Sequence, residues 1–185
     1  MLPARRNMLR VSGGKYRGRN LEVPEVGTVP TKNRVREAMM SICAFATEGA
    51  EVLDLFAGSG ALGIEALSRG AKHCVFVDAD RKACEIIKRN LALIKEQNAQ
   101  VINMPAREAL ERMKEKKFDL VFLDPPYAKK ELYEESISFL LENEMLPDGA
   151  VVLVEYEGEL QIDDSRFSFR RDYTYGMTKL IQLRK

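Results

Sequence analysis

The sequence contains few residues of the kinds that bind metals or form disulfides. Its cysteines are three, Cys43, Cys74 and Cys84, and His73 is its one histidine. An odd number of cysteines without CxxC or Cys/His ligand spacing predicts neither a disulfide framework nor a zinc site. We interpret the cysteines as small core residues and His73 as structural, because it precedes an apparent strand. We therefore expect no metal site.

Long hydrophobic runs are also missing. No apolar run reaches the ~18 residues that a membrane span requires, and the N-terminal Met-Leu-Pro-Ala-Arg-Arg lacks the apolar core of a signal peptide. A hydrophobic content of 45% and a charged content of 31% fit one globular domain with a small appendage in a chain of 185 residues. We expect a cytoplasmic protein, and a monomer, because no extra apolar stripe is left unexplained.

The net charge of +1 conceals an asymmetry along the chain. Residues 1–36 contain nine lysines and arginines against two glutamates, a net charge of +7, so the remaining residues sum to −6. Cations interleaved with an aromatic residue suit phosphate contacts and base stacking, although a charge run by itself more often marks a solvated arm. The side chains that we assign to RNA binding are Arg10, Lys15, Arg17, Arg19, Arg34 and Arg36. A structural ion-pair role fits Arg34 and Arg36 equally well.

The spacing of apolar residues predicts an α/β fold. Residues 8–23 alternate around Gly13-Gly14 and Gly18, which suggests a short β-hairpin, and residues 32–47 have helical spacing. Apolar strands then alternate with helical stretches, as in a right-handed parallel βαβ sheet. We expect strands near 51–56, 74–78, 100–104, 118–123 and 150–155, helices near 60–69, 81–97, 106–115 and 130–144, and a final antiparallel hairpin over 167–175 and 179–183. We divide the chain into a basic RNA-binding extension, 1–30, and a main domain, 31–185.

A glycine-rich turn lies between the first strand of this sheet and its helix. Gly58, Gly60 and Gly63 fit GxGxxG, and Asp78 follows 20 positions after Gly58, as in dinucleotide-binding proteins. Asp54 argues against NAD, because its carboxylate would repel a pyrophosphate and attract an ammonium and a sulfonium. S-adenosylmethionine carries both cations and no phosphate. We assign Asp54 to its amino-acid end, Asp78 to its ribose hydroxyls, and Gly58 and Gly60 to close backbone approach.

The most informative motif is Asp124-Pro125-Pro126-Tyr127. It follows a buried apolar run, 118–123, and open α/β sheets bind their ligands just past such carboxyl ends. The carboxylate and the proline carbonyls accept hydrogen bonds, and Tyr127 offers a stacking face. This combination suits the exocyclic amino group of a flat base, and we predict Asp124, Pro125 and Tyr127 as catalytic residues. The plainer interpretation is a strand that ends in a Pro-Pro turn with an incidental aspartate.

These motifs together resemble the RsmD family of bacterial small-subunit ribosomal RNA guanine-N2 methyltransferases. The segments that carry the resemblance are 54–63, 65–71, 124–127 and, near the N-terminus, 12–19 and 30–37. The resemblance covers nearly the whole chain and implies a seven-stranded, Rossmann-like class I methyltransferase fold. It also implies S-adenosylmethionine as methyl donor, with S-adenosylhomocysteine as product, and N2 of a guanine in 16S rRNA, guanine 966, as acceptor within a small-subunit or assembly particle.

The resemblance extends the donor site to Phe56 and Ala106. Related enzymes often carry Asp or Asn for the adenine amino group at the position that Pro105 occupies here. We therefore expect backbone atoms and apolar contacts to recognise the adenine.

Three other functions remain open at this point. A DNA adenine-N6 methyltransferase would use the same pocket chemistry, but so short a chain offers no separate base-reading domain. An NAD-dependent oxidoreductase would account for the glycines and Asp78 but not for residues 124–127. A non-catalytic RNA-binding assembly factor would keep the fold and lack turnover of the donor.

Overall fold

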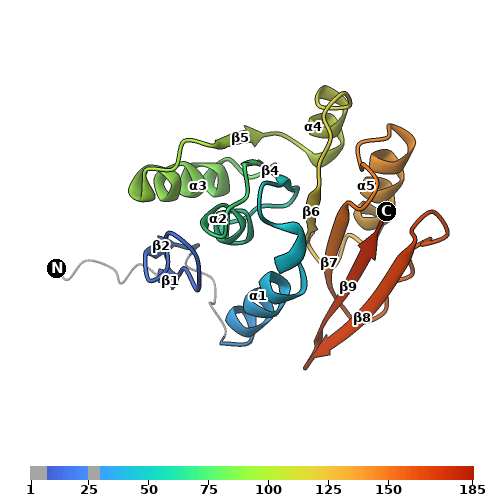
Figure 1. The fold of residues 1–185 in the computed structure, drawn as a ribbon, viewed down its shortest axis with the longest axis horizontal. Helices are drawn as coiled ribbons and strands as arrows, with labels where there is room; N and C mark the ends of the chain where they lie inside the picture. Colours follow the sequence, from blue (N-terminus) through green and yellow to red (C-terminus); the bar gives the residue numbers. More distant parts are fainter. Residues whose placement is uncertain (1–7, 25–29) are drawn as a thin grey trace.

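The fold is a seven-stranded sheet with helices on both faces and a small separate hairpin (Figure 1). The computed structural model describes residues 8–24 and 30–185. The sheet strands are β3 (Glu51–Asp54), β4 (His73–Asp78), β5 (Ala99–Asn103), β6 (Leu120–Leu123), β7 (Val151–Glu157), β8 (Phe169–Tyr175) and β9 (Thr178–Arg184). The helices are α1 (Pro30–Ile42), α2 (Ala61–Ser68), α3 (Arg81–Ile94), α4 (Ala106–Arg112) and α5 (Glu131–Glu142), with a 3₁₀ turn η1 (Ala44–Ala46).

The order of strands across the sheet is β5-β4-β3-β6-β7-β9-β8. Strands β3 to β7 are parallel, and the C-terminal hairpin adds β9 antiparallel to β7 and β8 antiparallel to β9. The predicted, mostly parallel sheet is therefore confirmed. From β3 the chain builds outward to β4 and β5, and then returns to add β6 on the other side. The carboxyl ends of β3 and β6 thus form a topological switch point, where open α/β sheets bind ligands.

The central strands are apolar on both faces because helices cover both sides. Successive side chains of a strand point to opposite faces. Val52 and Phe122 pack into the core that includes residues of α1, α2 and α3, whereas Leu53 and Val121 pack with residues of α4 and α5. This double burial explains the near-continuous apolar runs in the sequence.

The first helix is shorter than the sequence predicts. It ends at Ile42, and residues 44–46 continue as a 3₁₀ turn instead of the expected helix to residue 47. The hydroxyl of Thr47 donates to the carbonyl oxygen of Cys43 at 2.8 Å. This side-chain bond competes with the backbone pattern that would continue an α-helix.

The N-terminal hairpin is confirmed and packs on the main core. Its strands β1 (Met8–Arg10) and β2 (Asn20–Glu22) are antiparallel, with Leu9 opposite Leu21. Leu9, Leu21 and their neighbours Val11 and Val23 are buried in the same cluster as residues of α1, α2 and α3. The hairpin is thereby fixed beside the carboxyl end of β3. Among the helices that the structure describes, none is long and apolar enough to cross a membrane.

Candidate active site

A cavity of about 250 Å³ opens at the carboxyl ends of β3 and β6. Its walls come from the sheet, from α1 and from the N-terminal hairpin. The lining residues are Leu9, Val23, Pro24, Asn33, Arg36, Asp54, Phe56, Ala57, Gly58, Ser59, Ala61, Leu62, Asp124 and Glu155.

The glycine turn presents bare backbone to this cavity. Gly58 and Gly60 have φ of 55° and 77°, in the left-handed region that glycine adopts without strain. A Cβ added at Gly58 would meet no atom within 4 Å, so the turn leaves space for a ligand there. Gly63 has another role, because a Cβ there would lie 2.3 Å from the ring of Phe76. Its missing side chain lets α2 pack closely on β4.

Asp54 ends β3 at the floor of the cavity. Its side chain is buried, with 2% of the residue exposed, and its Oδ2 accepts a hydrogen bond from the Gly63 N–H at 3.0 Å. Burial raises the pKa of Asp54 to about 7, against the opposing effect of that N–H and with a further contribution from Asp78. A carboxyl group in this state is stabilised as the carboxylate when a cation binds beside it.

These residues fit the predicted methyl donor. Asp54, Asp124 and Glu155 line the cavity, and among its described lining residues Arg36 is the one cation, so the charge of the cavity favours a cationic ligand over a pyrophosphate. Asp78, at the end of β4, accepts the Gly58 N–H with Oδ2 and the Asp80 N–H with Oδ1, each at 2.8 Å. A carboxylate has about four acceptor sites, so a ribose contact by Asp78 is compatible with these bonds and stays a prediction.

Beyond the end of β6, Asp124 is half-buried, Pro125 is buried and Tyr127 is half-buried. The Tyr127 hydroxyl donates to Oε1 of Glu155 at 3.0 Å, and the Tyr133 hydroxyl donates to the backbone carbonyl of Glu155 at 2.8 Å. Burial, reinforced by the charges of Glu155 and Asp124, raises the pKa of Tyr127. The hydroxyl therefore stays protonated and acts as a donor.

The structure brings some of the predicted site residues to one cavity and leaves others beside it. Asp54, Phe56, Gly58, Asp124 and Arg36 line the cavity. The lining does not include five other predicted site residues that the structure describes, Gly60, Asp78, Ala106, Pro125 and Tyr127. Ala106 begins α4, directly after the loop whose Met104 N–H donates to the Asp78 carbonyl at 3.1 Å.

Sequence reasoning missed Glu155 and the wall made by Leu9, Val23 and Asn33. Glu155 had a detectable signal, since it is an acid directly after the apolar run 151–154 of a predicted strand. The wall had no detectable signal in the sequence, because it depends on how the hairpin and α1 pack against the sheet.

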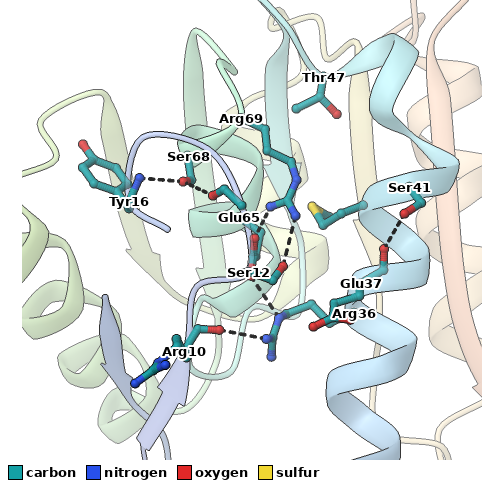
Figure 2. Close-up of polar contacts among 12 residues, drawn as sticks. Arg10, Ser12, Tyr16, Arg36, Glu37, Ser41, Thr47, Glu65, Ser68 and Arg69 are labelled. Atoms are coloured by element: carbon teal, nitrogen blue, oxygen red, sulfur yellow. Dashed lines mark hydrogen bonds and ion pairs between the residues drawn. The ribbon is translucent and has the colours of Figure 1, made fainter. Parts of the chain in front are cut away.

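A buried ion cluster attaches the hairpin to α1 and α2 (Figure 2). Glu65 of α2 is fully buried and accepts hydrogen bonds from the Ser12 N–H at 2.7 Å, from Arg36 Nε at 3.2 Å and from Arg69 Nη1. Arg36 Nη2 also donates to the carbonyl oxygen of Arg10 at 3.0 Å. Of the two roles left open for Arg36, its geometry fits the structural ion pair.

The remaining predicted RNA-binding side chains differ in what they contact. Lys15 Nζ lies 2.8 Å from Glu96 Oε2, and Arg19 Nη2 donates to the Leu93 carbonyl at 3.1 Å. Arg10, Arg17 and Arg34 are exposed, and no ion pair is found for them within residues 8–24 and 30–185. Their role in RNA binding stays a prediction.

The fold and the cavity together define a class I methyltransferase that uses S-adenosylmethionine. Residues 9–184 match the model of a family described as "Conserved hypothetical protein 95". The chain belongs to this family, the RsmD family of rRNA methyltransferases.

Individual relatives agree with this assignment. The chain is 43% identical over 152 residues to "Ribosomal RNA small subunit methyltransferase D" of Escherichia coli, covering 82% of this chain and 76% of that protein. Identity to the Haemophilus influenzae protein of the same name is 39% over 159 residues, covering 84% and 82%. Among solved structures, "Putative methyltransferase yhhF" from Escherichia coli superposes with a TM-score of 0.86 at 38% identity, covering 97% of this chain and 99% of that one.

Proposed function

We propose that this protein transfers a methyl group from S-adenosylmethionine to the exocyclic N2 of a guanine in 16S rRNA, in the cytoplasm. The observation that carries the proposal is that Asp124 and the glycine turn at Gly58 line the same cavity. A methyl donor on the turn and an amine at Asp124 would therefore meet there. The small-subunit rRNA named in the relatives supports the choice of RNA.

The acceptor amine is a poor nucleophile, because its lone pair is delocalised into the guanine ring. When bound, the donor supplies a methyl group on a positively charged sulfur. Asp124 and the Pro125 carbonyl accept hydrogen bonds from the amine and hold it in line with that methyl group, and such positioning contributes several kcal/mol to catalysis. The Asp124 carboxylate also stabilises the positive charge that develops on the nitrogen. The amine proton then leaves to Asp124 or to water.

Tyr127 offers an aromatic face for the base. Its hydroxyl bond to Glu155 fixes the ring beside the cavity. A guanine reaches this pocket only after leaving its stack, which is easier in unpaired RNA.

We propose the hairpin, within residues 1–30, as the surface that binds RNA. Arg17 and Arg19 are exposed on the loop that joins β1 to β2, and Arg10 is exposed on β1. If Arg17 and Arg19 contact phosphates, replacing both with Ala should weaken rRNA binding and reduce the slope of log K against log salt by about 2. Binding measured over a salt series tests this.

The matched control for that experiment is the pair Arg112→Ala and Lys114→Ala. Both residues are exposed at the end of α4, which packs on the other face of the sheet. This double variant should keep the salt slope of the unmodified protein. An unchanged slope in the Arg17 and Arg19 double variant would remove these two residues from the interface.

The enzymatic proposal is tested by methyl transfer from radiolabelled S-adenosylmethionine to unmodified 16S rRNA, as naked RNA and as small-subunit particles. Nucleoside analysis should find N2-methylguanine, and the two substrates show which form is required. Donor binding without transfer to either substrate would instead favour a non-catalytic assembly factor. A methylated adenine would identify the pocket as an adenine-N6 site.

A further inference from the structure

The cavity contains a second carboxylate beside the predicted catalytic aspartate. Strands β6 and β7 are parallel neighbours, and their register pairs Leu123 with Val154. Asp124, the first residue after β6, and Glu155 of β7 each directly follow this pair, and the backbones of neighbouring strands lie about 5 Å apart. Both side chains line the cavity.

Glu155 is held in a defined position. Only 7% of the residue is exposed. The Tyr127 hydroxyl binds its Oε1 at 3.0 Å, and the Tyr133 hydroxyl binds its backbone carbonyl at 2.8 Å. A carboxylate offers two oxygens and about four acceptor sites, so Glu155 can bind Tyr127 and a base N–H together.

Two adjacent acceptors match the edge of guanine. Guanine presents two neighbouring donors, N1–H and the N2 amine, whereas N1 of adenine is an acceptor. An ionised carboxylate only accepts hydrogen bonds. It would thus bind N1–H of guanine and face the lone pair of adenine N1 unfavourably, which leaves a buried charge unsatisfied.

We propose that Glu155 determines base specificity by accepting the N1–H of the target guanine while Asp124 accepts its N2 amine. This inference rests on the proposed guanine-N2 methylation and assigns the recognition of the base to a residue outside the Asp-Pro-Pro-Tyr motif. Tyr127 acts as a positioning residue for Glu155 in addition to offering its ring to the base.

The test compares guanine with 2-aminopurine at the target position of a semisynthetic rRNA substrate. 2-Aminopurine keeps the N2 amine but has an acceptor at N1. The protein should transfer methyl to 2-aminopurine about 100-fold more slowly than to guanine in single turnovers, because the site leaves a buried acceptor unpaired. In Glu155→Gln the amide can keep its oxygen on Tyr127 and donate its NH2 to N1 of 2-aminopurine. The guanine rate should fall and the ratio should narrow to about tenfold or less.

The comparison of ratios isolates the N1 contact. 2-Aminopurine also lacks O6, but this loss affects the wild-type protein and Glu155→Gln alike. It therefore cancels when the rate ratios of the two proteins are compared. Glu155→Asp keeps the acceptor and should keep the wild-type preference at a reduced rate. Glu157→Gln, two residues further along the same strand, should change neither the rate nor the ratio. Affinity for S-adenosylmethionine, measured by calorimetry, reports that each variant is folded.

The possible results separate the role of Glu155 in base specificity from a structural role. A purely structural role would lower the two rates of Glu155→Gln equally, and the unchanged ratio would overturn the inference, as would a wild-type protein that does not discriminate at all. A wild-type protein that forms no N2-methylguanine on any substrate would instead overturn the proposed function itself, and the inference with it.

Discussion

The two halves of the cavity are built in different ways. The donor half of the lining is one continuous segment, β3 and the turn into α2, in which backbone groups and the missing side chain of Gly58 create the surface. The acceptor half is assembled from β6 and β7, and a hydrogen bond between Tyr127 and Glu155 joins them. We therefore expect donor binding and methyl transfer to respond to different substitutions.

The largest effect should come from the acceptor half. In Asp124→Ala the amine loses the carboxylate that orients it and stabilises its developing charge, so turnover should fall on the order of a thousandfold. The affinity for S-adenosylmethionine should stay largely intact, because the glycine turn is unchanged. Single-turnover transfer and calorimetric donor binding measure the two effects separately. Preserved turnover in this variant would contradict the role of Asp124.

A substitution in the donor half should instead act through folding. In Gly63→Ala the new Cβ would lie 2.3 Å from the Phe76 ring and 2.7 Å from Cys74 Sγ, so α2 or the ring must shift. Such overpacking costs about 1–3 kcal/mol of unfolding free energy, and the higher helix propensity of Ala offsets about 1 kcal/mol of it. Denaturant unfolding checks this. An unchanged or higher stability would show that Phe76 has room to move.

The same contrast explains what could be predicted from the sequence. The donor half depends on local features, a strand, a glycine turn and a helix that are consecutive in the chain. The structure places Asp54, Phe56 and Gly58 along one cavity, and their contact with the donor stays a prediction. All seven strands of the sheet were also predicted from the sequence. Helices on both faces keep the central strands apolar, whereas β8 is largely exposed and was predicted from the hairpin pattern around Gly176.

Features that depend on contacts between distant segments were missed. Glu155 joins the site only because β7 lies beside β6 in a particular register. The sequence could not decide whether Arg36 binds RNA or forms a structural ion pair, because its partner Glu65 lies 29 positions away and is buried. Both of these features follow from tertiary packing rather than from local pattern. The early end of α1 has a local cause that the apolar spacing did not reveal, the bond from the Thr47 hydroxyl to the Cys43 carbonyl oxygen.

The smallest predicted effect is a pH dependence of donor affinity, and it comes from the electrostatics of the donor half. Because burial raises the pKa of Asp54 to about 7, this group is partly protonated near neutral pH before the donor binds. A cationic donor favours the carboxylate, so binding should release a proton from Asp54. The affinity for the donor should therefore rise with pH by up to about tenfold per unit below pH 7, and level off above it.

Calorimetry between pH 5.5 and 7.5, in buffers of different ionisation enthalpy, measures both the affinity and the proton release. The upper limit keeps the donor's own amino group, whose pKa is about 7.7–8, mainly charged. In Asp54→Asn the pH dependence should flatten, and the affinity at pH 7.5 should fall to the value that the protonated wild type shows at low pH. The same slope in both proteins would mean that another group titrates, and that Asp54 ends β3 as a structural acceptor for the Gly63 N–H alone.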